Sequence, residues 1–139
     1  MRRGAASRVR VTFGVLNAFV ALILVVAELA YVRPHCWPLD ASAALVSSVE
    51  LVSAVALLAD LSWALRALRT AAWVSLVVGL VVVALVGLTM AFLAGVHGDT
   101  GYAGALVSGL VIALLVPYTI VLPALQLLWL GRQVRELQR

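Results

Sequence analysis

Three acidic residues, Glu28, Glu50 and Asp60, interrupt runs of Val, Leu and Ala that are long enough to cross a membrane. An ionised, unpaired carboxylate in hydrocarbon costs roughly 2.5–3.5 kcal/mol on insertion scales, so such residues usually face the protein interior. There they can handle a proton or a cation, or a neutral carboxyl can join helices through hydrogen bonds. Both uses require helices that shelter the acids from lipid.

The three acids lie at different depths. At about 1.5 Å per residue, Glu28 lies about 7 Å and Glu50 about 12 Å below the outer boundary. No basic residue is expected at the level of Glu50, so we predict a neutral carboxyl that is hydrogen-bonded to Asn17, Ser47 or Thr119. Asp60 lies near the inner boundary, where we predict an ion pair with one of four arginines: Arg8, Arg10, Arg66 or Arg69.

Other polar residues accompany these acids at helical spacing. Glu50 shares a predicted face with Ser47, Ser53 and Asp60, and further polar faces contain Asn17 with Glu28, and Ser108 with Thr119 and Gln126. We predict that these faces meet inside a bundle. A proton or cation pathway would then comprise Glu28, Glu50, Asp60, Asn17 and Thr119.

A second chemistry is suggested by His35, Cys36 and His97, which lie in the two predicted outer loops. Imidazole and thiolate suit copper or zinc. However, neither H-x-x-x-H nor C-x-x-C spacing occurs, and a single cysteine excludes an intramolecular disulfide. A solvated histidine is the simpler interpretation, so we expect no bound cofactor and keep a metal site as an alternative.

Enzyme motifs are missing from the chain. It has no nucleophile elbow, phosphate-binding glycine loop or zinc-protease signature. The tetrapeptide Gly98-Asp-Thr-Gly101 contains the triplet of aspartic proteases, but it occurs once, in a short loop where a turn explains it better. We therefore expect a protein that is not an enzyme.

The elements that must position these residues are membrane helices. Of the 139 residues, 65% are hydrophobic and 12% are charged, against roughly 45–50% and 25% in soluble domains. Four apolar stretches each exceed the roughly 20 residues needed for a span: 11–32, 43–65, 71–96 and 103–130. We predict an all-α, polytopic membrane protein with four transmembrane helices in an up-down bundle that forms one domain, 1–139. The first stretch is too long for a signal-peptide core, so we expect it to be retained.

Charge placement predicts the orientation. The net charge is +4, and every arginine except Arg33 lies near a terminus or between the second and third stretches. Short arginine-rich segments stay cytoplasmic, so both termini are predicted to be cytoplasmic. Because this charge flanks membrane spans, we expect no nucleic-acid partner. The use of Arg without Lys favours a GC-rich bacterial genome, and hence the bacterial inner membrane.

Small residues and prolines predict how the last two helices pack. Two runs of small residues at four-residue spacing predict a close contact between the outer halves of these helices: Gly87, Ala91 and Gly95, and Ala105, Gly109 and Ala113. Pro117 and Pro123 each remove a backbone hydrogen bond, so they predict a kink or hinge in the fourth helix.

A weak internal repeat suggests that a helical hairpin was duplicated. The pattern W-x-x-R-x-x-R begins at Trp63 and again at Trp129, and the sequence Ala-Leu-Val-Ser begins at Ala44 and at Ala105. Short matches are common in Ala- and Leu-rich chains, so chance remains the alternative. A true duplication would relate the hairpins by a pseudo-twofold axis along the membrane normal.

Three functions follow from these patterns. The first is a structural or interaction protein that works as a homo-oligomer, or as a subunit of a membrane complex, within the lipid bilayer. The second is a small proton or cation transporter or channel that uses Glu50 and Glu28. The third is a metal-binding or redox membrane protein that uses His35, Cys36 and His97.

Overall fold

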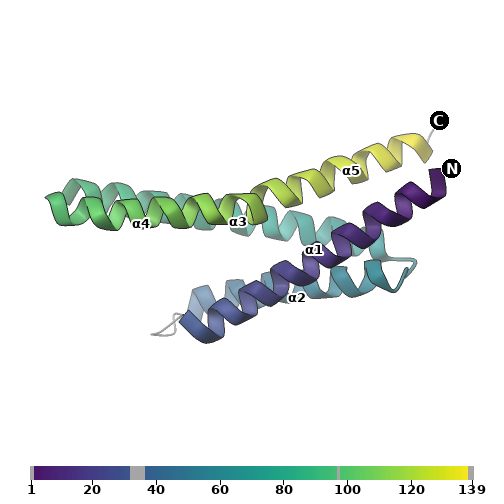
Figure 1. Ribbon diagram of the computed structural model, residues 1–139, viewed down its shortest axis with the longest axis horizontal. Helices are drawn as coiled ribbons and strands as arrows, with labels where there is room; N and C mark the ends of the chain where they lie inside the picture. The colour runs from purple at the N-terminus through teal and green to yellow at the C-terminus, as the bar shows by residue number, and fades with distance from the viewer. Residues whose placement is uncertain (1, 32–36, 97, 138–139) are drawn as a thin grey trace.

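The computed structural model describes residues 2–31, 37–96 and 98–137, and the elements of these residues are all helical (Figure 1). In chain order they are α1 (Arg2–Tyr31), α2 (Trp37–Leu58), α3 (Ala64–Val96), α4 (Gly98–Val116), the π-helical turn η1 (Pro117–Val121) and α5 (Leu122–Leu137). Four helical stretches are long and apolar enough to cross a membrane: Ser7–Val26, Asp40–Leu58, Ala64–Phe92 and Ala103–Arg132. The predicted all-α class and the multi-pass membrane character are confirmed.

The helices form two hairpins that are packed together at one end only. Helix α1 lies beside α2, and α3 lies beside α4 (Figure 1). The start of α1 and the end of α5 lie at the same end of the molecule, where α5 closes over the first hairpin. Toward the other end the hairpins diverge, and α4 extends with the C-terminal half of α3 away from α1 and α2. A closed up-down bundle therefore stays a prediction.

The packed end contains the apolar core. Buried side chains from three helices form one cluster: Ala56, Leu57, Ala64, Leu68 and Leu130. The rings of Phe13 from α1 and Trp129 from α5 meet edge to face against this cluster, with their centroids 5.5 Å apart. An aromatic pair of this geometry contributes roughly 0.5–1.5 kcal/mol beyond the area it buries. This contact brings α5 against α1.

The turn between α2 and α3 lies earlier in the chain than predicted. Helix α2 ends at Leu58 and α3 begins at Ala64, so the predicted boundaries at residues 65 and 71 are wrong. The N–H of Asp60 bonds the carbonyl of Leu57, and the N–H of Leu61 bonds that of Ala56, as in a Schellman C-cap. Asp60 takes the left-handed position of this cap, with φ of 52°. Aspartate tolerates that conformation better than most residues.

The predicted break in the fourth helix occurs as the π-helical turn η1. Pro117 begins the turn, and the N–H of Leu122 bonds the carbonyl of Pro117, five residues earlier. Pro123, which is fully buried, has no N–H for the carbonyl of Thr119 one turn back. The two prolines thus explain why the regular ladder of hydrogen bonds widens here.

The closest approach in the second hairpin is also not where it was predicted. A Cβ built on Gly79 would lie 2.6 Å from Thr119 Cβ and 2.7 Å from Thr119 O, so α3 and η1 touch through backbone. By contrast, a Cβ on Gly87 or Gly95 would meet nothing within 4 Å. Only part of the expected α4 face is in contact: a Cβ built on Gly109 would lie 3.7 Å from Met90 Sδ of α3. The predicted role of Gly87 and Gly95 within the hairpin is wrong.

These two kinds of glycine predict opposite effects of adding a methyl group. Gly79→Ala should lower the free energy of unfolding by about 1–3 kcal/mol, because the new Cβ forces α3 away from η1. Gly131→Ala, the control, should stabilise α5 by about 0.5–1 kcal/mol, because alanine has less conformational freedom than glycine in the unfolded chain and its Cβ would meet nothing within 4 Å. Reversible unfolding in mixed micelles measures both. Equal effects would contradict the close approach.

Candidate functional site

A buried amide joins three helices at the centre of the packed end. Asn17 of α1 is fully buried, and its Nδ2 donates to Ser53 Oγ of α2 at 3.1 Å. Gln126 of α5, also fully buried, donates from Nε2 to Asn17 Oδ1 at 2.5 Å. The two bonds connect residues that lie 36 and 109 positions apart in the sequence. The predicted meeting of polar faces is therefore confirmed for Asn17, Ser53 and Gln126, which we call the amide node.

Glu50 lies one helical turn from the amide node, on the same face of α2 as Ser53. It is 3% exposed, and Ser75 Oγ of α3 donates to its Oε1 at 2.5 Å. Within the described residues its Oε2 is buried without a partner, as is Oε1 of Gln126. The carboxyl is thus sheltered from lipid as predicted, but one of its oxygens is not satisfied by the protein.

The predicted partners of Glu50 are wrong. Asn17 bonds Ser53 and Gln126 instead, Ser47 donates to the carbonyl of Ala44, and Thr119 donates to that of Leu115. Ser75 was not predicted because α3 has few polar residues and no polar face was assigned to it, although Ser75 lies in a run of small residues with Ala71 and Gly79. The feature that could have identified Ser75 is its hydroxyl group, which is rare within a span and lies on the helix that follows Glu50.

Side chains of the packed end are arranged in layers that follow the helical turns. An apolar layer contains Phe13 of α1 and Leu57 of α2. Steps of four residues lead from Phe13 to Asn17 and from Leu57 back to Ser53, which belong to the amide node. A step of three residues from Ser53 along α2 reaches Glu50. Because apolar side chains separate this polar layer from the end of the molecule, its hydrogen bonds form out of contact with bulk water.

Asp60 lies apart from this layer, in the turn between α2 and α3. Its Oδ1 is 2.5 Å from a guanidinium nitrogen of Arg10 of α1. The predicted ion pair is confirmed, with Arg10 as the partner. The Asp60 side chain is 79% exposed and that of Arg10 is 27% exposed, so we assign the pair little stability. It links the turn to α1 at the end that bears the termini.

The remaining predicted site residues are not brought together. Thr119 packs against Gly79, one helical turn along α3 from Ser75, and its hydroxyl bonds the carbonyl of Leu115 rather than Glu50. Glu28 lies in α1 with a side chain outside the described part. The side chains of His35, Cys36 and His97 also lie outside the described residues. Among the residues that are described, no three His, Cys, Asp or Glu side chains group around a possible metal position.

Chemically, this arrangement is a hydrogen-bonded joint with two unsatisfied oxygens. Amide, hydroxyl and carboxyl groups from four helical segments are paired across helix boundaries: α1, α2, α3 and α5. Comparison with protein-family models, with curated protein sequences and with solved structures finds no match for this chain. Its function is therefore inferred from the arrangement of its own side chains.

The amide node predicts an energetic coupling between α1 and α5. Asn17→Ala should lower the free energy of unfolding by about 1–3 kcal/mol, because it leaves the buried amide of Gln126 without its acceptor. Gln126→Ala should have a smaller cost, and the double variant should reveal a coupling energy of about 0.6–1.7 kcal/mol.

Thr89→Ala is the control for this cycle, because its exposed hydroxyl bonds only the carbonyl of Leu85 in its own helix. It should change stability by less than about 0.5 kcal/mol. Additive effects of the Asn17 and Gln126 substitutions, within the error of the micelle unfolding experiment, would show that the node does not join the helices.

Proposed function

We propose that this protein is a non-catalytic integral membrane protein that works as a homo-oligomer or as a subunit of a larger membrane complex. One observation carries the proposal: the second hairpin leaves a face of small residues open. Added Cβ atoms at Gly87 and Gly95 would meet nothing within 4 Å, and Ala91 between them is exposed. Helices associate in lipid through close packing at such faces rather than through the hydrophobic effect.

The exposure of α4 supports the same proposal. Its large side chains project from the hairpin: Leu106, Val107, Leu110 and Leu114 are 62–73% exposed. Lipid alone covers apolar side chains well, so this exposure has no cost by itself. Together with the open glycines, however, it leaves the outer half of α3 and α4 available to another helix. The two hairpins pack against each other at the opposite end, around the amide node.

The proposal includes an orientation and a topology. We place both termini in the cytoplasm, with the four spans in up-down order and the protein in the bacterial inner membrane. Supporting this are Arg10, Arg66 and Arg132, which lie in the elements that meet at the end bearing the termini.

The tandem duplication of a hairpin rests on the sequence matches alone. Trp63 precedes α3, with Arg66 and Arg69 inside that helix, whereas Trp129 and Arg132 lie within α5. A duplicated ancestor would therefore have changed a helix boundary in one copy.

If the open face binds a second copy, enlarging it should separate the copies. Native mass measurement of the protein extracted in mild detergent is expected to show more than one chain per complex. Gly87→Leu combined with Gly95→Leu should shift the complex to single chains, because the new side chains prevent close approach. Gly131→Leu is the control, since a Cβ at this position of α5 would also meet nothing within 4 Å. Single chains in the unmodified protein, with no other subunit attached, would contradict the proposal.

A second candidate is a small proton or cation transporter, and the state of Glu50 favours it. A nearly buried carboxyl with one unpaired oxygen can take up and release a proton, and Ser75 is a hydroxyl that could accept or relay it. Such a pathway would continue through Glu28, the other acid of the pathway predicted from the sequence.

Ion flux into proteoliposomes separates the two candidates. The first predicts that the unmodified protein and Glu50→Gln give equal flux at the level of protein-free vesicles. Glutamine keeps an acceptor for the Ser75 hydroxyl, so the variant should fold. Asp60→Asn is the control for loss of an acid outside the buried layer. A flux that Glu50→Gln abolishes and Asp60→Asn preserves would replace the first candidate with the second.

A further inference from the structure

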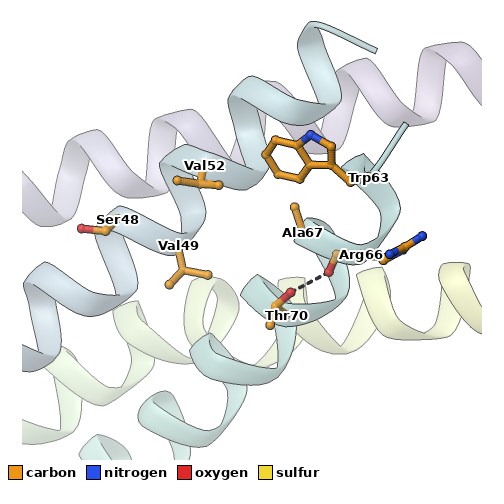
Figure 2. A pocket seen from close by; sticks show the side chains of 7 residues that line it. All are labelled: Ser48, Val49, Val52, Trp63, Arg66, Ala67 and Thr70. Atoms are coloured by element: carbon orange, nitrogen blue, oxygen red, sulfur yellow. Dashed lines mark hydrogen bonds between the residues drawn. The ribbon is translucent and has the colours of Figure 1, made fainter. Parts of the chain in front are cut away.

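A groove of about 430 Å³ lies between α2 and the start of α3, away from the buried polar layer (Figure 2). Val49 and Val52 of α2 form one wall, and Ala67 and Thr70 of α3 form the other. Its volume is within the roughly 300–1,000 Å³ typical of small-ligand sites. The groove opens on the outside of the hairpins, where lipid surrounds the protein.

The hydroxyl groups inside this groove already donate hydrogen bonds to the backbone. The Thr70 hydroxyl donates a hydrogen bond to the carbonyl of Arg66 at 2.6 Å. The Ser48 hydroxyl donates one to the carbonyl of Ala44 at 2.6 Å. The other wall residues are valines and an alanine. A ligand inside the groove must therefore be apolar, because a polar group there would lose its hydrogen bonds to water without replacement.

One end of the groove is charged. Figure 2 shows Trp63 and Arg66 at this end and Ser48 at the other. No hydrogen bond or ion pair from the Arg66 guanidinium occurs within the described residues, and the side chain is exposed. The nearest acid in the turn, Asp60, is paired with Arg10. Arg66 is thus an unneutralised cation at the mouth of an apolar groove.

The depth of the groove matches one leaflet of a bilayer. Ser48 and the end of α2 at Leu58 are separated by about 15 Å at about 1.5 Å per residue. Half of a hydrocarbon core of about 30 Å has the same depth. Trp63 and Arg66, at the charged end, belong to the two residue types that favour the membrane interface.

We propose that this groove is a binding site for an anionic phospholipid of the leaflet on the side of the termini. One acyl chain lies along Val49 and Val52, and the phosphate lies at Arg66, beside the indole of Trp63. Basic positions between transmembrane helices bind anionic headgroups in this way. A second groove of about 420 Å³, between α1 and α2, has no charged residue in its lining, so size alone does not select the lipid headgroup.

Quenching of tryptophan fluorescence by brominated lipids tests the proposal directly. The full chain would carry Trp63 alone, with Trp37, Trp73 and Trp129 replaced by Phe, in vesicles containing brominated phosphatidylglycerol or brominated phosphatidylcholine. We expect about a fivefold preference for phosphatidylglycerol at Trp63, the factor that one arginine contributes near an anionic lipid. A matching chain that carries only Trp73, which is 51% exposed on α3 outside the groove, should show no preference.

Substitutions then distinguish a specific lipid site from a general attraction of anionic lipid to the arginines. Arg66→Gln should remove the preference at Trp63, whereas Arg69→Gln, an equal charge change on the same helix outside the groove lining, should retain it. Val52→Phe should weaken quenching at Trp63 by both lipids, because the ring fills the groove. Val52 is half exposed and Arg66 is exposed, so both variants should fold. Equal quenching by the two lipids at Trp63, or an equal loss in the Arg66 and Arg69 variants, would overturn the proposal.

Discussion

The amide of Asn17 holds together segments that the sequence places far apart. In a soluble protein, burial of apolar surface would bring such helices together, but in lipid that driving force is absent between membrane spans. Directional bonds and close backbone approaches must replace it. Asn17 donates to α2 and accepts from α5, so one side chain satisfies partners on both sides. The aromatic contact of Phe13 with Trp129, one turn away, keeps the same two helices in register.

This constraint explains why the molecule is packed at one end and open at the other. The polar side chains that link helices, the apolar cluster and the contact of Gly79 with Thr119 all occur on the side of α3 that leads back to the termini. Beyond Gly79, α3 packs against α4, and among the described residues no polar contact links this part of the hairpin to α1 or α2. The open half is where the proposed association takes place, and the closed half bears the proposed lipid groove.

The class of the protein could be read from its sequence because hydropathy and length act over whole segments. The inward position of Asn17, Ser53, Gln126 and Glu50 was also predictable, since a polar residue in a span has few other places to go. The partner of Glu50 was not. Which helix supplies the hydroxyl depends on rotations about helix axes that no local pattern encodes.

Two other errors have local causes. Four of the five residues from Leu61 to Leu65 are hydrophobic, so hydropathy extends the second apolar stretch past Asp60, where the chain in fact turns. The contact face of α3 was assigned from Gly87, Ala91 and Gly95, although Ala71, Ser75 and Gly79 form a second run of small residues at the same four-residue spacing. Spacing identifies candidate faces, whereas the approach of a particular backbone, here that of Thr119, decides which face is used.

The π-helical turn has a consequence for phase. A turn that closes over five residues instead of four contains one residue more than the regular helix, which rotates everything after it by about 100° around the axis. Helices α4 and α5 therefore present unrelated faces even though they are continuous in the chain. Thr119 meets α3 while Gln126 meets α1, so a regular helical count carried from Thr119 to Gln126 wrongly puts these two side chains on one face.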